Sequence, residues 1–355
     1  MGNPGSPCPF FFVSYHTDLF PPVSHTVDTA LPAIGQGMEE RKMYKPPHKL
    51  LAAALSVLCV ASFAMAQKDD KKNGPSGTPI LWEKTDVASY DTAAGPLGDV
   101  QPDLSKVTFI EEEKGGFSKK YKIKDAAGRT WVAKVGDEAQ SETAAVRLVS
   151  AIGFRTDTNV LVPKLTIPGV GDLTNVRLEA RPDDVKRLGT WSWKDNPFKG
   201  TKEFQGLKVM MAFLNNWDMK EANNVILEKD GKDYYAISDL GVSFGKTGSN
   251  GLPVFWRVGR SRNSPEEYAE ADFIKRVKDG KITFNFNGKN DGSLGDVTLA
   301  DGRWLADLLN QLTDKQIEDA FRAANYSDAD VKTLSQSVRE RIRALDFVTR
   351  PPSAE

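Results

Sequence analysis

LNNWDMKEANNVILEKDGKDYYAISDLGVSFG, residues 214–245, is the stretch that decides the fold of this chain. A polar turn leads into a short apolar run, Val225–Leu227, and a Lys-Asp-Gly turn at 229–231 separates this run from a second one that ends at Ile237. Two apolar runs joined by an Asp-Gly turn predict a β-hairpin. Because a hairpin holds its two ends side by side, the residues before and after it should converge.

Oxygen-bearing side chains stand at both ends of this predicted hairpin. Asp218 and Asn223 precede it, and Asp239 follows it. Two carboxylates and a carboxamide at one place form an all-oxygen cluster, which suits magnesium bound together with phosphate oxygens. The sequence therefore predicts a magnesium and phosphate site at the open end of the hairpin.

The same residues resemble the catalytic loop of the protein-kinase-like superfamily. Asp218, Lys220 and Asn223 have the Asp-x-Lys-x-x-Asn spacing, and Ser238–Gly241 is similar to the metal-binding Asp-Phe-Gly, with leucine in place of phenylalanine. The resemblance implies that Asp218 orients and deprotonates an acceptor hydroxyl, while Lys220 neutralises charge on the transferred phosphoryl group. It also implies that Asn223 and Asp239 hold magnesium.

A second part of the resemblance lies upstream. Trp131–Lys134 is similar to the Val-Ala-x-Lys of the third kinase strand, which implies that Lys134 contacts the α- and β-phosphates of ATP. Glu142, in the first turn of a helix predicted at 141–152, would position that lysine. The gap of only eight residues indicates a divergent, atypical branch. A lysine on a solvated strand face and a carboxylate favoured by the helix dipole are the alternatives for these two residues.

Gly115 and Gly116 lie between two predicted strands, 107–111 and 119–124. In a kinase-like fold this turn covers the nucleotide, and two glycines let backbone N–H groups approach the phosphate oxygens. An ordinary Gly-Gly hairpin explains the pair equally well.

The fold class that follows is α+β, with a two-lobed kinase-like architecture. An antiparallel β-rich N-lobe, which binds the nucleotide, is predicted at 80–181, and a mainly helical C-lobe with the catalytic loop at 182–347. Further strands at 130–135, 160–167 and 175–180 would complete a five-stranded sheet. The apolar periodicity predicts C-lobe helices, and one strand at 281–287. The helices are expected at 201–214, 268–277, 301–312, 314–324 and 327–347, before a disordered tail at 348–355.

The amino-terminal part of the chain has the sequence pattern of a targeting segment. Residues 43–66 combine a basic start, an apolar stretch and an Ala-Met-Ala cleavage signal, which predicts a signal peptide cut after Ala66 and export to the periplasm or the exterior. Its apolar stretch is shorter than the ~20 residues that span a membrane, so no stable span is expected after cleavage. Residues 1–42 are interpreted as an extension upstream of the true start, which is Met43 or Met38, and a real N-terminal extension is the alternative. Residues 67–79 are interpreted as a flexible lead.

Composition excludes several kinds of chemistry. All histidines and cysteines precede residue 67, so the mature chain offers no Ser-His-Asp or Cys-His nucleophile, no Cys/His zinc site and no disulfide. The whole chain carries 47 basic and 48 acidic residues without a strongly basic tract, so no nucleic-acid partner is expected.

The expected function is magnesium-dependent phosphotransfer from ATP to a hydroxyl on a protein, sugar or small molecule. Two alternatives stay open: an exported pseudokinase or binding module without turnover, and an unrelated exported α+β domain. The source of ATP outside the cytoplasm is the objection to an active kinase, and transfer of the nucleotide in place of the phosphate is also open.

Overall fold

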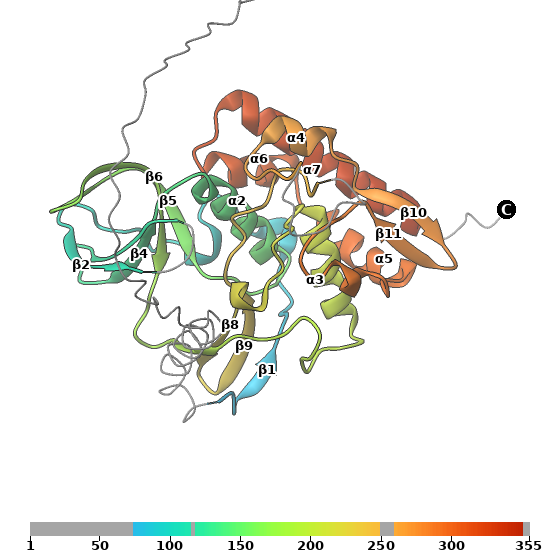
Figure 1. Cartoon of the computed structure of the whole chain (residues 1–355), viewed down its shortest axis with the longest axis horizontal. Helices are drawn as coiled ribbons and strands as arrows, with labels where there is room; N and C mark the ends of the chain where they lie inside the picture. The colour runs from blue at the N-terminus through green and yellow to red at the C-terminus, as the bar shows by residue number, and fades with distance from the viewer. Residues whose placement is uncertain (1–73, 115–117, 249–258, 351–355) are drawn as a thin grey trace, which may run out of the picture. The chain divides into compact units, whose positions relative to one another are not determined.

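The computed structural model describes residues 74–114, 118–248 and 259–350. The predicted signal peptide, the chain before it, Gly115 and Gly116 lie outside the described residues. Within them the architecture is α+β, with an antiparallel sheet in the first part of the chain and a helical C-terminal portion (Figure 1). The predicted fold class is therefore confirmed at this level.

A five-stranded antiparallel sheet has the order β2-β3-β4-β6-β5. Its strands are β2 (Thr108–Glu113), β3 (Lys120–Lys124), β4 (Thr130–Lys134), β5 (Asn159–Ile167) and β6 (Gly171–Ala180). Alternation along the strands places Ile123, Trp131 and Leu178 in a buried cluster of their own. The predicted number of strands is correct, and Lys134 is the last residue of a central strand.

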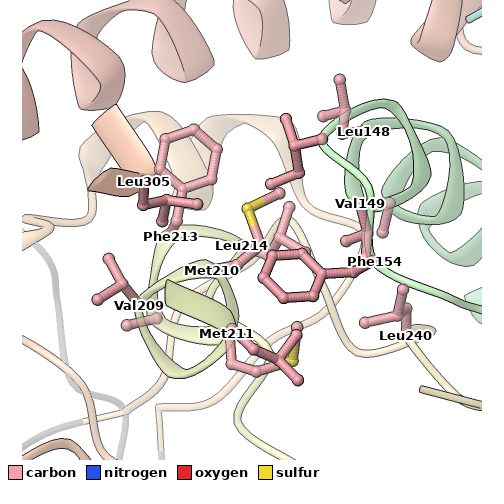
Figure 2. Packing of buried hydrophobic residues seen from close by; sticks show 14 of the residues in the cluster. Leu148, Val149, Phe154, Val209, Met210, Met211, Phe213, Leu214, Leu240 and Leu305 are labelled. Atoms are coloured by element: carbon pink, nitrogen blue, oxygen red, sulfur yellow. The ribbon is translucent and has the colours of Figure 1, made fainter. Parts of the chain in front are cut away.

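Helix α2 (Glu138–Ala151) connects β4 to β5 and is buried along almost its whole length. It starts three residues earlier than the sequence predicts, which adds Glu138 to its first turn. Figure 2 shows Leu148 and Val149 of α2 in one apolar cluster with Met210 and Met211, which belong to the next helix. Burying each such side chain contributes about 1.5–3 kcal/mol, so α2 is firmly fixed in place.

Helix α3 (Lys202–Phe213) leads into the predicted catalytic loop. The Thr201 side chain caps it by accepting a hydrogen bond from the Phe204 N–H. Met210 and Met211 of this helix are almost completely buried and belong to the core.

A second sheet contains the predicted hairpin and has the order β1-β9-β8-β7. Strands β8 (Asn224–Lys229) and β9 (Lys232–Ile237) pair antiparallel, and Asp230 and Gly231 take positive φ angles in the tight turn between them. Two short strands flank the hairpin. Strand β1 (Thr78–Ile80) runs parallel to β9 and lies beside it in Figure 1. Strand β7 (Lys186–Gly189) pairs antiparallel with β8.

The structure of the C-terminal portion shows that one predicted helix is wrong in part. The helix expected at 268–277 is wrong in its second half, because α4 (Pro265–Glu270) ends early and β10 (Ile274–Lys278) pairs with β11 (Lys281–Phe284). Asp279 and Gly280 take positive φ angles, 51° and 71°, and reverse the chain between the strands. An Asp-Gly turn is a hairpin signal, and here it prevails over the helical spacing of the apolar residues.

Three helices complete this portion: α5 (Leu299–Leu309), α6 (Asp314–Arg322) and α7 (Asp328–Thr349). Thr298 and Thr313 form capping boxes at the starts of α5 and α6. In the part of the chain that the structure describes, no helix has both the length and the apolar character of a membrane span.

Candidate functional site

The predicted catalytic loop closes on itself through hydrogen bonds. The side-chain nitrogen of Asn223 donates to the Asp218 backbone carbonyl at 2.8 Å and to the Asp218 carboxylate oxygen Oδ2 at 3.3 Å. Lys220 Nζ lies 2.7 Å from the same Oδ2. The three predicted residues of this loop therefore lie together. Asp218 Oδ1 accepts no hydrogen bond from the described residues, so that oxygen is available to another donor.

The hairpin brings Asp239 next to this loop. Asn224 and Ile237 are paired at the open end of the hairpin, and the backbone N–H groups of Ser238 and Asp239 donate to the Asn223 carbonyl at 2.8 Å and 3.3 Å. Asn223 thus binds Asp218 through its side chain and Asp239 through its backbone. The convergence predicted from the Asp-Gly turn is present.

Lys134 reaches the same place from the five-stranded sheet. Its Nζ lies 2.9 Å from Glu142 Oε2, 3.0 Å from Glu138 Oε2 and 3.4 Å from Asp239 Oδ1. Its side chain is only 3% exposed. The structure thus brings Lys134, Glu142 and Asp239 together, and it does not place the lysine on a solvated strand face.

The contacts between Lys134 and the surrounding carboxylates determine the charge states of Lys134 and Asp239. Burial alone would lower the pKa of Lys134, but Glu142, Asp239 and Glu138 outweigh it and hold that pKa above its ordinary value. Burial alone would raise the pKa of Asp239, but Lys134 and the Gly241 N–H, 3.0 Å from Oδ1, hold it below the ordinary range. A charged ammonium and an ionised carboxylate therefore face each other.

The sequence did not single out Glu138, which lies one helical turn before Glu142. Besides Lys134, it accepts a hydrogen bond from Ser118 Oγ at 3.2 Å and pairs with Arg262. Gly241 packs against it so closely that a Cβ atom there would come within 2.7 Å of Glu138 Cβ. Its spacing of four residues from Glu142 places both carboxylates on one face of α2, which is the signal that could have revealed it.

A chain of ion pairs leads away from Glu142 and was also not predicted. Arg177 of β6 lies 2.9 Å from Glu142 and 2.9 Å from Glu179, and all three side chains are buried. Arg177 and Glu179 are two residues apart on one face of the strand, and Arg177 is paired with Lys134 across the sheet. Two charged residues at alternate positions in the buried second half of this strand are the sequence signal for this arrangement.

The chain of ion pairs continues to Ser238. Arg187 of β7 lies 3.6 Å from Glu179 and binds Asp157 with two hydrogen bonds, at 2.6 Å and 3.1 Å. Asp157 in turn accepts a hydrogen bond from Ser238 Oγ at 2.5 Å. We call Lys134, Glu142, Arg177, Glu179, Arg187 and Asp157 the ion-pair chain. The ion-pair chain starts at Lys134, which contacts Asp239, and ends at Asp157, which binds Ser238, the residue before Asp239.

The residues present fit a magnesium ion held with phosphate groups. Among the described residues no cluster of three or more His, Cys, Asp or Glu side chains is arranged to hold a metal ion by itself. Asp239 Oδ2 and Asn223 Oδ1 accept no hydrogen bond from the described residues, so two oxygens remain available. Magnesium takes one or two protein oxygens and fills the other positions with phosphate and water, so this pair suits a metal that arrives with a nucleotide.

Comparison with known proteins gives no sequence relative. No protein-family model matches this chain, and no curated protein does.

Solved structures do match it. The proinflammatory kinase CtkA of Helicobacter pylori has a TM-score of 0.44 and 11% identity, over 70% of this chain and 98% of that one. The Rio2 kinase of Chaetomium thermophilum, solved as an ADP/Mg²⁺ phosphoaspartate complex, has a TM-score of 0.31 and 10% identity, over 67% and 72%. The Golgi casein kinase, solved with Mn/ADP bound, has a TM-score of 0.36 and 11% identity, over 87% and 90%. Because every TM-score is below 0.5, we take the function from the side-chain geometry of this chain. By structure, the chain matches protein-kinase-like folds at low sequence identity.

Proposed function

We propose that this protein is a magnesium-dependent phosphotransferase that moves a phosphoryl group from ATP to a hydroxyl acceptor. The observation that carries the proposal is the convergence of Lys134, Asp218 and Asp239, which come from three separate parts of the chain. Lys134 contacts Asp239 directly, and Asn223 connects Asp239 to Asp218 through its backbone and its side chain.

Lys134 and Glu142 form the nucleotide-binding pair in this proposal. Glu142, which is buried and itself paired with Arg177, fixes the Lys134 ammonium, so the lysine side chain need not be ordered when a phosphate arrives. Lys134 would shift its third contact from Asp239 to the α- and β-phosphates. Asp239 Oδ2 and Asn223 Oδ1 would hold magnesium, which supplies charge neutralisation for the phosphates when bound.

Asp218 is the proposed general base. Its Oδ2 is occupied by Lys220 and Asn223, so Oδ1 would accept the proton of the acceptor hydroxyl. Lys220 is about half exposed, which leaves its ammonium free to turn toward negative charge on the phosphoryl group. No histidine is needed for these steps, because phosphoryl transfer depends mainly on positioning and charge neutralisation.

Export of the enzyme is part of the proposal and is supported by the signal-peptide pattern at 43–66. An exported enzyme must receive its nucleotide outside the cytoplasm or inside a host compartment.

Labelled ATP tests the proposal directly. The purified protein is incubated with Mg²⁺ and ATP carrying the label on either the γ- or the α-phosphate, with its own hydroxyl groups as acceptors. We expect transfer from the γ-position, lowered about 10²–10⁴-fold in Asp218→Asn. Asp195→Asn, an exposed residue with no hydrogen bond in the described structure, is the matched control and should retain the wild-type rate.

The other outcomes are distinct. Label from the α-position would identify nucleotide transfer in place of phosphotransfer. Magnesium-dependent thermal stabilisation by ATP without any transfer would support a pseudokinase. If the folded protein is not stabilised by millimolar ATP, both the active transferase and the pseudokinase are excluded. At one hundred times Kd, bound nucleotide should stabilise the fold by about 2.7 kcal/mol.

A further inference from the structure

Three carboxylates surround the ammonium of Lys134. Its Nζ lies 2.9 Å from Glu142, 3.0 Å from Glu138 and 3.4 Å from Asp239. An ammonium has three N–H donors, so these three contacts use all of them. A phosphate oxygen can therefore bind Lys134 only if it displaces a carboxylate. If Asp239 turns to magnesium, one N–H becomes available, and a second phosphate oxygen requires that Glu138 or Glu142 also gives up its contact.

Glu138 is the more easily displaced of the two carboxylates on α2. The Glu142 side chain is 1% exposed and is held by Arg177 at 2.9 Å. Glu138 is the first residue of the helix, and its side chain is 11% exposed. A side chain at the start of a helix, partly in contact with solvent, can change its rotamer with less repacking than one in the interior. Glu138 is thus the carboxylate that we expect to leave Lys134.

Glu138 has a second cation in Arg262. Its Oε1 pairs with the Arg262 guanidinium, while its Oε2 binds Lys134 and accepts a hydrogen bond from Ser118 Oγ at 3.2 Å. Burial alone would raise the pKa of Glu138, but Lys134 and Arg262 hold it below its ordinary value, so the carboxylate is ionised. When Oε2 leaves Lys134, Arg262 still compensates the charge of Glu138, and the cost of an isolated buried charge is avoided.

The loop that carries Arg262 is held against the segment that follows the proposed metal-binding carboxylate. The backbone N–H of Asn263 donates to the Ser243 carbonyl at 3.0 Å. The two segments are in close contact, since a Cβ atom at Gly245 would come 2.8 Å from the Arg262 backbone nitrogen. A displacement of this loop would therefore separate the Arg262 guanidinium from Glu138.

We propose that Glu138 competes with the nucleotide phosphates for Lys134, and that Arg262 determines how strongly it competes. This competition rests on the proposed function, since it concerns the lysine that binds the phosphates there. With Arg262 in place, Glu138 turns to Arg262 and Ser118, and the ammonium binds the phosphates. Without Arg262, Lys134 is the remaining cation of Glu138 among the described residues, and the carboxylate also repels the phosphates. The position of Arg262 thereby controls nucleotide affinity.

Binding of MgADP tests the competition without turnover, because ADP retains both phosphates that Lys134 would contact. Calorimetry measures its affinity for the wild type, both single variants and the double variant. Arg262→Gln should bind MgADP about tenfold more weakly than the wild type, and Glu138→Gln at least as tightly. The double variant should bind as Glu138→Gln does, because the competitor is absent. Arg322→Gln, an exposed arginine of α6 that pairs with Asp328, is the matched control and should bind as the wild type does.

Kinetics separate this role from a purely structural one. Arg262→Gln should raise the KM for ATP about tenfold and leave kcat within about twofold, because saturating nucleotide displaces Glu138 from Lys134. Arg262→Lys, which keeps the positive charge, should stay close to the wild type. Thermal unfolding without nucleotide establishes that each variant is folded.

The proposal is overturned if Arg262→Gln binds MgADP as the wild type does, or if Glu138→Gln binds it more weakly. It is also overturned if the loss caused by Arg262→Gln persists in the Glu138→Gln chain. These outcomes leave the proposed nucleotide site intact, since the wild type still binds MgADP. A folded wild type that does not bind MgADP would overturn the proposed nucleotide site, and the competition with it.

Discussion

The side-chain nitrogen of Asn223 lies 2.8 Å from the backbone carbonyl oxygen of Asp218, to which it donates a hydrogen bond. This bond closes the loop that carries the proposed base, and the backbone carbonyl of the same asparagine accepts from Ser238 on the far strand of the hairpin. One residue, Asn223, therefore sets the position of the proposed base relative to Asp239, the proposed metal ligand.

Substitution of Asn223 should separate these roles. Asn223→Asp keeps an oxygen for the metal but loses the donor to Asp218, so we expect it to lower kcat while it retains magnesium dependence. Asn223→Ala loses the oxygen for the metal as well and should lower kcat about tenfold further or more, because the charge of the phosphates is then less well neutralised. Rates at varied Mg²⁺ concentration measure this. Equal rates for the two variants would show that the side-chain oxygen at position 223 has no role of its own, because both variants lose the hydrogen bond to Asp218.

Lys134 should be essential for stability as well as for catalysis. Lys134→Met leaves Glu138, Glu142 and Asp239 close together without their shared cation, and breaking a buried ion pair costs about 3–5 kcal/mol. Glu142→Gln in the same chain should restore part of this loss. Urea unfolding of both single variants and the double variant measures the coupling. Strictly additive losses would contradict the direct contact.

Asp157 should make the fold sensitive to acid. Burial alone would raise the pKa of this carboxyl group, but Arg187, Arg181 and Ser238 outweigh it and hold the pKa below its ordinary value of 3.8. The ionised form therefore stabilises the fold above about pH 4, and this contribution is lost as the pH falls through the lowered folded-state pKa.

We expect Asp157→Asn to be less stable than the wild type at pH 7, by about 3–5 kcal/mol, and to lose less stability than the wild type on acidification. The free energy of unfolding between pH 7 and pH 2 tests this, with Asp195→Asn as an exposed control. A variant whose pH profile runs parallel to that of the wild type would rule out the linkage.

Gly206 should not tolerate alanine, although it lies within a helix. Alanine is ordinarily favoured over glycine there by about 1 kcal/mol. At this position a Cβ atom would come 2.3 Å from the Trp304 ring, so Gly206→Ala should destabilise the fold by about 1–3 kcal/mol.

Trp304→Leu in the same chain should recover part of that loss, because it removes the obstructing ring. Gly292→Ala, which meets no atom within 4 Å, is the control and should change stability by less than about 0.5 kcal/mol. Thermal unfolding measures all three variants. An unchanged melting temperature for Gly206→Ala would show that α3 and α5 can separate to admit the methyl group.

The sequence predicted the hairpin and the residues around it because their signals are local. The Asp-Gly turn at Asp230 sets the register of β8 and β9, and that register alone makes Asn223 and Asp239 converge. The five strands and α3 were likewise predicted from the local pattern of apolar residues along the chain.

Other parts could not be predicted because their cause is tertiary. Arg177 reads as an ordinary charged residue of a strand until β6 is paired with β4, which places it against Glu142. Glu138 was missed because the start of α2 was predicted at Ser141, and helix boundaries depend on contacts that periodicity does not show. Strand β1 has three residues, too few for an alternating pattern to stand out.

Strand β1 also has a protective role. Through Thr78–Ile80 it covers the outer backbone edge of β9, whose sequence includes Tyr234 and Tyr235. A protease that trimmed the amino-terminal lead beyond Ile80 would leave that edge with unpaired N–H and C=O groups, ready to pair with the same strand of another copy. Degradation of this protein would then first appear as self-association, while every proposed catalytic residue was still in the chain.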